Sequence, residues 1–297
     1  MTVRVEARNL SLDYGDVEAI RDVSLSLADG RIYGLLGRNG SGKTSLMSLL
    51  AGFRRPTAGE ALVDGEPVFE NGNATRKVCL IREGADTVDS MEKVEAGLEF
   101  AARMRPYWDD AYARRLLDRF ELSARKKVGD LSRGQRAALA VTLGLASRAP
   151  VTMFDEAYLG LDAPSRYVFY DELLRDFMEH PRLVVVSTHL IEEVSLLFEE
   201  VLILHEGRLI LQDEAEAFRM RGANVIGPRD TVDRFVAGMT VLERRELGPT
   251  ASAVVYGEFD DHLRRKAVEA GLEVGPLPLQ DLFVHLTSSQ EGEDDRS

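Results

Sequence analysis

Hydrophobic residues alternate with polar ones near the N-terminus of the chain, over residues 3–5 and again over residues 23–27. A period of two predicts β-strands that bury one face. The pair Asp29-Gly30 follows and predicts a tight hairpin turn. The chain is therefore expected to begin with antiparallel strands.

Farther along, several short runs are apolar without interruption. Ile32–Leu36, Val151–Phe154 and Leu183–Val186 each have the length of a strand that is buried on both faces. Segments with helical spacing lie between them, including residues 91–128. Buried strands that alternate with helices predict an α/β fold around a parallel sheet.

The composition changes after about residue 214, where short strands alternate with helical stretches as far as residue 287. We interpret residues 1–214 as one domain with a helical insert at about 84–134, and residues 215–287 as a small C-terminal α/β domain. Residues 288–297 are acidic and are expected to be disordered. A length of 297 residues fits two domains.

Residues 37–44 read Gly-Arg-Asn-Gly-Ser-Gly-Lys-Thr, directly after an apolar strand and before a helical pattern. This is the phosphate-loop pattern, in which glycines let backbone N–H groups and a helix N-terminus converge on phosphate oxygens. Lys43 is predicted to reach the β- and γ-phosphates and Thr44 to bind Mg²⁺. The alternative is a glycine-rich turn with a chance lysine, but the strand–loop–helix order favours a nucleotide site.

The apolar run Val151–Phe154 ends in two acids, Asp155 and Glu156. In a phosphate-loop ATPase, an aspartate at this place holds Mg²⁺, here through water, and the glutamate faces the attacking water. Taken alone, the pair also fits an acidic N-cap of the next helix. The phosphate loop upstream favours the catalytic interpretation.

Charge and composition exclude several classes of protein. The net charge is −13, with 37 Lys and Arg against 50 Asp and Glu, which argues against non-specific binding to nucleic acid or anionic lipid. The single cysteine, Cys79, fits a reducing compartment. The N-terminus has no apolar signal-peptide core, and no apolar run approaches the ~18 residues of a membrane helix. We expect a chain that does not itself span a membrane.

Leu131-Ser132-Arg133-Gly134-Gln135 lies between the phosphate loop and the two acids. It matches the signature of the ATP-binding cassette (ABC) family, whose other motifs follow in order. Tyr14 matches the adenine-stacking aromatic, Gly160-Leu161-Asp162 the D-loop, and His189 the switch histidine. Taken singly, the segment Leu131–Gln135 also fits a helix start, Tyr14 a surface aromatic and His189 a capping residue. Together, over residues 1 to about 214, the chain resembles an ABC ATPase.

The resemblance implies two cassettes that close head to tail around two ATP molecules with Mg²⁺. Lys43 and the loop amides of one subunit hold the phosphates, and Ser132 and Gly134 of the other subunit contact the same γ-phosphate. Glu156 polarises the water, His189 touches the γ-phosphate, and Asp162 connects the two sites. Catalysis is then positioning and charge neutralisation. The nucleotide-binding residues implied are Tyr14, Gly37, Arg38, Asn39, Gly40, Ser41, Gly42, Lys43, Thr44, Ser45, Glu83, Ser132, Gly134, Gln135 and Asp162.

The chain departs from the family pattern in two places. Glu83 stands where the family usually has a glutamine, and it becomes a third candidate Mg²⁺ ligand beside Thr44 and Asp155. Ala157-Tyr158-Leu159 replaces the usual Pro-Thr-Ser. We expect Glu83 to tune turnover or coupling, and the second change to alter local packing only.

Two further segments resemble those of small two-component bacterial exporters for drugs or antibiotic peptides. Arg105–Asp109 carries the only tryptophan, Trp108, in the insert that receives a helix from the membrane subunit in this family; its alternative role is a cap on the insert's own core. Pro278–Leu286 predicts a C-terminal helix with an apolar stripe of Leu279, Leu282, Phe283 and Leu286. That stripe serves either dimer contact and regulation or packing on the domain's own sheet.

The function implied is that of the ATP-hydrolysing subunit of a membrane transporter, of the exporter type. The partners implied are an integral-membrane permease and a second ABC subunit, identical or paralogous, with no nucleic acid. The expected location is the cytoplasmic face of the cell membrane, reached through the permease. Two alternatives stay open: a soluble ABC ATPase of the translation or DNA-repair type, and a regulatory module that binds ATP but hardly hydrolyses it.

Overall fold

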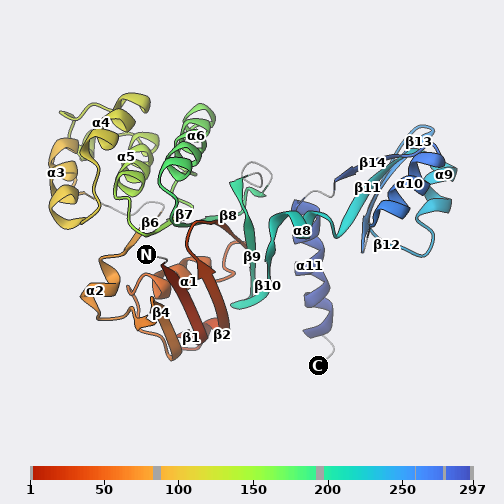
Figure 1. Ribbon diagram of the computed structural model, residues 1–297, viewed down its shortest axis with the longest axis horizontal. Coiled ribbons are helices and arrows are strands. Elements are labelled where there is room, and N and C mark those ends of the chain that lie inside the picture. Colours follow the sequence, from red (N-terminus) through yellow and green to blue (C-terminus); the bar gives the residue numbers. More distant parts are fainter. Residues whose placement is uncertain (1–2, 83–87, 192–196, 258, 277–278, 295–297) are drawn as a thin grey trace. The chain divides into compact units, whose positions relative to one another are not determined.

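The computed structural model describes residues 3–82, 88–191, 197–257, 259–276 and 279–294 (Figure 1). The chain separates into two compact units, residues 1–189 with 197–212, and residues 190–196 with 213–297. Each unit has its own core. Among the described residues, no helix has both the length and the apolar character needed to cross a membrane.

The first unit contains strands β1 (Arg4–Tyr14), β2 (Val17–Ala28), β3 (Ile32–Leu36), β4 (Ala58–Val63), β5 (Glu66–Pro67), β6 (Val78–Arg82), β7 (Val151–Asp155), β8 (Leu183–Thr188), β9 (Glu200–His205) and most of β10 (Arg208–Glu214). Its helices are α1 (Lys43–Leu50), α2 (Gly72–Thr75), α3 (Val94–Met104), α4 (Asp110–Arg119), the 3₁₀-helix η1 (Val128–Asp130), α5 (Arg133–Ala146) and α6 (Ala163–Glu179).

The N-terminal strands form a four-stranded antiparallel sheet in the order β2-β1-β4-β5, as the alternating pattern predicted. The prediction of a hairpin at Asp29-Gly30 is wrong. Strand β3 leaves this sheet and pairs in parallel with β8 and β9 in a second one. Because every residue of β3 is buried, the strand needs neighbours and cover on both faces, which an edge position beside β2 does not provide.

The second sheet has six strands in the order β10-β9-β3-β8-β7-β6. The pairings of β3, β6, β7, β8 and β9 are parallel, and β7 and β8 are buried along their whole length. The predicted parallel α/β core is therefore confirmed. In the register of the sheet, Leu36 lies beside Thr188 and Asp155 beside Ser187. This alignment brings the carboxyl ends of β3, β7 and β8 to one edge.

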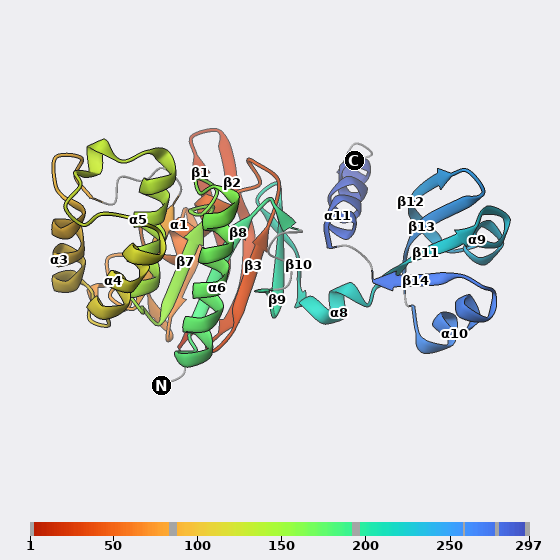
Figure 2. The ribbon, with the colours of Figure 1, turned by 90° about the horizontal axis from the view of Figure 1, so that it is seen from above.

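Helices α3, α4 and α5 lie together at the β6 side of this sheet, where α5 packs on β6 and β7 (Figures 1 and 2). Helix α6 contributes Phe169, which is fully buried and packs edge-on against Phe154 at 5.2 Å between ring centroids. Tyr158 is also fully buried and stacks on Phe169 at 5.4 Å. Tyr158 of the departure at residues 157–159 thus provides core packing, and the expectation that the departure alters packing only stays a prediction.

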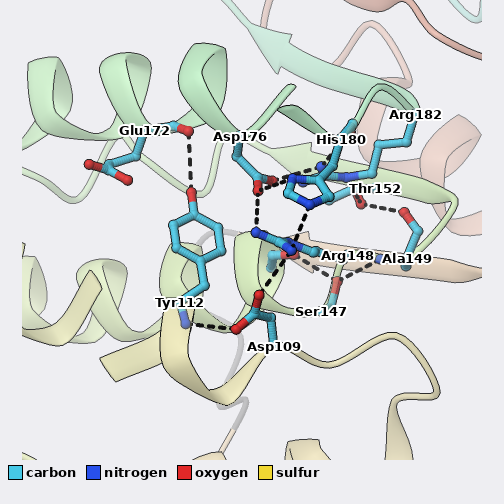
Figure 3. A network of polar contacts seen from close by, with 11 residues as sticks. Asp109, Tyr112, Ser147, Arg148, Ala149, Thr152, Glu172, Asp176, His180 and Arg182 are labelled. Atoms are coloured by element: carbon cyan, nitrogen blue, oxygen red, sulfur yellow. Dashed lines mark hydrogen bonds and ion pairs between the residues drawn. The ribbon is translucent and has the colours of Figure 1, made fainter. Parts of the chain in front are cut away.

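A buried ionic network joins these helices to the sheet (Figure 3). The carboxylate of Asp176 on α6 lies 2.7 Å from Nη1 of Arg182 and 3.1 Å from Nη2 of Arg148. Nη1 of Arg148 lies 2.9 Å from Oδ2 of Asp109, the N-cap of α4. Nε of Arg182 donates to Oγ1 of Thr152 on β7 at 3.2 Å. One buried carboxylate on α6 is therefore shared by two guanidinium groups that lead to α4 and to β7.

The second unit contains helix α8 (Ala215–Arg219) and then β11 (Gly222–Pro228), α9 (Arg229–Phe235), β12 (Thr240–Leu247), β13 (Thr250–Tyr256), α10 (Asp261–Glu269), β14 (Glu273–Pro276) and α11 (Leu279–Asp294). Its sheet is antiparallel in the order β12-β13-β11-β14. A β-α-β-β-α-β succession with this strand order is the ferredoxin-like arrangement. The small C-terminal α/β fold expected from the sequence is therefore present, with an antiparallel sheet.

Helices α9 and α10 cover one face of that sheet, and α11 lies on the other (Figure 2). The ring of Tyr256 on β13 lies 5.4 Å from that of His285 on α11. Leu279, Leu282 and Phe283 of the predicted apolar stripe are buried. Residues 288–294 differ from the expectation of disorder, since α11 continues to Asp294. Pro278 and residues 295–297 lie outside the described residues.

Candidate functional site

The phosphate loop joins β3 to α1, and its glycines are required by close packing. A Cβ at Gly37 would lie 2.3 Å from Oγ of Ser41, and a Cβ at Gly42 would lie 2.5 Å from the backbone oxygen of Ala19. Gly42 is also the N-cap of α1, with φ of 104°, a conformation that favours glycine. The close packing and the left-handed conformation of Gly42 therefore fix the turn from β3 into α1, which is the strand–loop–helix arrangement of phosphate-binding loops.

Lys43 is buried beneath this loop, although it carries a charge. Its Nζ donates to the backbone oxygen of Gly37 at 2.7 Å and to that of Arg38 at 3.2 Å. Oε1 of Glu156 lies 3.3 Å from the same Nζ. A buried ammonium needs such compensation. Two backbone oxygens and one carboxylate oxygen thus fix the lysine side chain at the phosphate loop.

Asp155 and Glu156 follow β7, and a hydroxyl of the neighbouring strand holds both. Oγ of Ser187 on β8 donates to Oδ1 of Asp155 at 2.7 Å and accepts from the backbone N–H of Glu156 at 3.1 Å. Glu156 has φ of 52°, a left-handed conformation that is unusual for a residue other than glycine. Backbone strain of this kind concentrates at functional sites. The left-handed conformation of Glu156 directs its side chain away from the line of β7 and towards Lys43 of the phosphate loop.

His189 follows β8 and completes a short polar chain across the site. Its Nδ1 lies 3.1 Å from Oε1 of Glu156, the same oxygen that faces Lys43. All three predicted catalytic side chains therefore meet at one carboxylate oxygen. Ser187, which orients two of the acids, was not among the predicted residues. It lies two positions before His189 in the sequence, but only the pairing of β7 with β8 shows its role.

A pocket of about 610 Å³ extends from this cluster to Tyr14. Eight predicted residues line it together: Tyr14, Asn39, Gly40, Gly42, Lys43, Thr44, Ser45 and Glu156. Sequence reasoning missed the other part of the lining, which is Val17, Glu18, Ala19, Arg21, Glu206 and Gly207. The backbone N–H of Gly207 donates to the Ser41 oxygen at 2.9 Å, so the β9–β10 turn is fixed to the phosphate loop. That contact has no local sequence signal.

Tyr14 is 42% exposed, so an aromatic side chain is open to solvent at this end of the pocket. The guanidinium carbon of Arg54 lies 5.3 Å from the centroid of that ring. This cation–π contact fixes one side of the ring and draws electron density from it. Arg54 is a second residue that the sequence did not point to, since it acts through Tyr14.

The signature residues lie outside this pocket lining and form the start of α5 instead. Oγ of Ser132 accepts from the backbone N–H of Gln135 at 3.2 Å, and Oε1 of Gln135 accepts from the backbone N–H of Ser132 at 3.3 Å. This is a capping box. A Cβ at Gly134 would lie 3.5 Å from the backbone oxygen of Gly160, so the signature packs beside the D-loop. Within one chain, these residues do not line the pocket that contains the phosphate loop.

Asp162 is the N-cap of α6, where its Oδ1 accepts from the backbone N–H of Ser165 at 3.0 Å. Hydrogen bonds from the side chain and backbone of Ser165 hold the pKa of Asp162 below its ordinary value. The carboxylate is therefore charged at the start of a helix, which the helix dipole favours. Glu83 lies outside the described residues, so its relation to the site stays a prediction.

The donors present fit a magnesium ion that is shared with a nucleotide. The described residues contain no group of three or more His, Cys, Asp or Glu that could hold a metal alone. Mg²⁺ at nucleotide sites uses one or two protein oxygens and completes its shell with phosphates and water. Thr44 lines the pocket, and Asp155 is buried with one oxygen bound by Ser187. Both are hard oxygen donors of the right kind.

Comparisons with known proteins agree with this site. The ABC transporter family model matches residues 20–159. The chain is 31% identical over 298 residues to Nod factor export ATP-binding protein I of Burkholderia orbicola, with 96% of this chain and 97% of the relative covered. The chain belongs to the ABC transporter ATP-binding family. This ABC ATPase is also 29% identical over 299 residues to doxorubicin resistance ATP-binding protein DrrA of Mycobacterium tuberculosis, with 94% and 90% covered.

Solved structures show the same fold. An ATP-binding subunit of an ABC transporter superposes on the ABC ATPase with a TM-score of 0.65 at 22% identity, covering 72% of this chain and 91% of that one. A dimeric cassette bound to ADP and phosphate gives 0.62 at 21% identity, covering 71% and 98%. The relatives above match beyond the cassette, along nearly their whole length. The protein is an ATP-binding transporter subunit similar to those of exporters.

Proposed function

We propose that this ABC ATPase powers export through ATP-dependent pairing of two cassettes, joined to a membrane permease at the cytoplasmic face. The observation that carries the proposal is the meeting of Lys43, Glu156 and His189 at one carboxylate oxygen beside the phosphate loop. Full-length similarity to export ATP-binding proteins supports the direction of transport.

In this proposal, Tyr14 stacks on the adenine, while the loop amides of residues 38–44 and Lys43 hold the phosphates. When bound, Mg²⁺ neutralises phosphate charge, and Thr44 and Asp155 are the residues that would hold it. When ATP binds, its γ-phosphate replaces the Glu156 carboxylate as the partner of the Lys43 ammonium. The freed Glu156 then orients water, and His189 contacts the γ-phosphate.

The second cassette supplies what one chain does not bring to the phosphates. Ser132 and Gly134 are fixed at the N-terminus of α5, where a capped helix start presents donors to an anion. Because they lie outside the pocket lining of their own chain, we assign them to the nucleotide of the partner cassette, with Gln135 as the brace of the cap and Asp162 between the two sites.

The test of turnover compares the wild-type full chain with Glu156→Gln. We expect Mg²⁺-dependent ATP hydrolysis to fall by a factor of about 100 or more, with an ATP-bound dimer accumulating on size exclusion. Rapid hydrolysis by the variant would remove Glu156 from this role. A wild-type chain that binds ATP and does not hydrolyse it, alone or with its membrane partner, would favour the regulatory-module alternative.

The test of the partner is affinity purification of the chain from detergent-solubilised membranes. A multi-helix membrane protein at about one copy per cassette is expected. A partner-free dimer or ribosomal material would favour a soluble ABC ATPase instead. Trp108→Ala is a useful companion variant, because the structure half-buries the Trp108 side chain. Normal membrane association of this variant would assign Trp108 to the fold.

A further inference from the structure

A second pocket, of about 490 Å³, lies at the amino ends of strands in the six-stranded sheet. Lys77, Pro150 and Arg182 line it, and they stand immediately before β6, β7 and β8. These strands pair in parallel, so their amino ends meet at one edge of the sheet. The phosphate loop and Glu156 follow the carboxyl ends of β3 and β7. The amino-edge pocket is therefore separate from the nucleotide pocket.

Arg182 contributes a buried guanidinium to the amino-edge pocket (Figure 3). The residue is 4% exposed, its Nη1 lies 2.7 Å from the Asp176 carboxylate, and its Nε donates to Oγ1 of Thr152. Its Nη2 is buried and has no hydrogen-bond partner in the described part of the chain. Nε of Arg148, which lines the same pocket, is also buried, and no described residue accepts from it. Buried polar groups are normally hydrogen-bonded, so these two donors require an acceptor that the described chain does not supply.

Two carboxylates in the lining of the pocket limit the charge of that acceptor. Asp64 lies 2.6 Å from Nζ of Lys77 and accepts from the backbone N–H of Arg4 at 3.0 Å. Asp29 accepts from the backbone N–H of Gly30 at 3.0 Å. Both carboxylates have donors of their own, but each still repels a nearby anion. A carboxylate, with one negative charge, therefore fits the pocket better than a phosphate dianion.

The rest of the ligand would meet rigid apolar and aromatic surface. Val3, Pro150 and Pro181 line the pocket, and Tyr107 adds an aromatic side chain that is 47% exposed. Small-molecule sites of this volume combine such surfaces with a few polar groups that fix the orientation of the ligand. Proline and tyrosine rings pack well against a flat ring. The shape of the lining therefore favours a cyclic body over a flexible chain.

We propose that the amino-edge pocket binds a ring-bearing monocarboxylate, whose carboxylate accepts from Arg182 and Arg148 and whose ring packs against Tyr107. This ligand differs in class from a nucleotide, so the pocket is a second small-molecule site of the ATPase. The proposal does not depend on the proposed function, because the residues that carry it take no part in binding ATP or in the pairing of cassettes.

The test is isothermal titration calorimetry of the full chain with naphthoate as the probe. Saturating ADP is present, so that the nucleotide pocket is occupied. Two further probes keep the ring and change the polar group: naphthamide is neutral, and naphthyl phosphate carries a dianion. The comparison separates the contribution of the charge from that of the ring.

Two variants change the pocket, and each has a matched control. Arg182→Lys keeps a positive charge but removes the guanidinium, whereas Tyr107→Ala removes an exposed ring. Arg119→Lys is the control for the first, since Arg119 lies 3.2 Å from the buried carboxylate of Glu172 and outside the pocket lining. Tyr167→Ala is the control for the second, because Tyr167 is exposed and also lies outside the lining.

We expect naphthoate to bind one site per chain, about tenfold more tightly than naphthamide. Arg182→Lys should weaken naphthoate about tenfold and leave naphthamide unchanged, and Tyr107→Ala should weaken both probes. The two control variants should bind as the wild type does.

Equal binding of naphthoate and naphthamide would overturn the proposal, as would tighter binding of naphthyl phosphate than of naphthoate. An equal loss in Arg182→Lys and Arg119→Lys would do the same, because a general effect on the fold would then explain both. If circular dichroism shows that Arg182→Lys does not fold, Tyr107→Ala and Tyr167→Ala decide: a loss of naphthoate binding in the first alone supports the pocket, and equal binding by the two contradicts it.

Discussion

The Nζ atom of Lys43 lies 3.3 Å from Oε1 of Glu156, so the cation proposed to bind phosphate and the carboxylate proposed to orient water contact each other beside the phosphate loop. The lysine side chain is 5% exposed and the glutamate side chain 18% exposed. At such low exposure, water weakens the attraction between the two opposite charges less than it would at the surface. The carboxylate therefore competes with the γ-phosphate of ATP for the lysine.

This competition predicts a change in affinity, separate from the change in turnover. Glu156→Gln should bind ATP without Mg²⁺ several-fold more tightly than the wild type, about the effect of 1 kcal/mol. The reason is that ATP no longer has to displace a carboxylate from Lys43. Fluorescent-nucleotide titration measures the affinity. Glu206→Gln removes another carboxylate from the same pocket, one without a described contact to Lys43, and should have a smaller effect. Equal gains in both would contradict the competition.

Ser187→Ala should lower kcat by about tenfold and leave KM for ATP nearly unchanged. The hydroxyl contacts Asp155 and the backbone of Glu156, and neither contact involves the base or the ribose. The Mg²⁺ concentration for half-maximal activity should rise as well, because Asp155 loses the donor that orients it. Ser147→Ala is the matched control, since Ser147 is equally buried but donates to Gly144 on α5. A purely structural role would make the two variants alike.

Arg54→Ala should raise KM for ATP about threefold with kcat unchanged, since the guanidinium acts on Tyr14 and on no phosphate contact. Steady-state kinetics at saturating Mg²⁺ separates the two constants. Arg55→Ala, the adjacent residue, removes the same charge without a described aromatic contact. A similar rise in KM for Arg55→Ala would mean that the loss of a positive charge, and not the contact with Tyr14, causes the effect. Restoration by Arg54→Lys is expected to be partial, because an ammonium stacks less well on a ring.

Asp176→Asn should destabilise the cassette by about 3 kcal/mol, because it leaves the Arg148 and Arg182 guanidiniums without their shared buried carboxylate. Urea unfolding of the full chain, followed by the fluorescence of Trp108 in the cassette, measures the loss. Asp171→Asn on the same helix changes an exposed side chain and should be nearly neutral. A loss below about 1 kcal/mol would mean that the two guanidiniums find other partners.

Local sequence patterns predicted much of the fold because they report local physics. Period-two alternation placed β1 and β2, and uninterrupted apolar runs placed β3, β7 and β8. The hairpin at Asp29-Gly30 failed for a non-local reason. A turn sequence specifies a change of direction, whereas the sheet that β3 joins depends on β8 and β9, which lie far along the chain.

The candidate site likewise contains residues that the sequence predicts and residues that only the structure reveals. Gly37–Thr44 and the acids Asp155 and Glu156 were found from the sequence because phosphate binding needs fixed residue types at fixed spacing. Ser187 and Arg54 were not found, since each acts through a residue on another element. Their contacts arise from strand register and helix packing.

The sequence by itself thus determined the family, the phosphate loop and the acids that follow β7, because backbone conformation and phosphate chemistry constrain neighbouring residues. Only the tertiary structure decided that one oxygen of Glu156 faces both Lys43 and His189, and that Ser132 stays outside the pocket of its own chain. The physical reason is that parallel pairing aligns the end of β3 with the ends of β7 and β8, which lie more than one hundred residues farther along the chain.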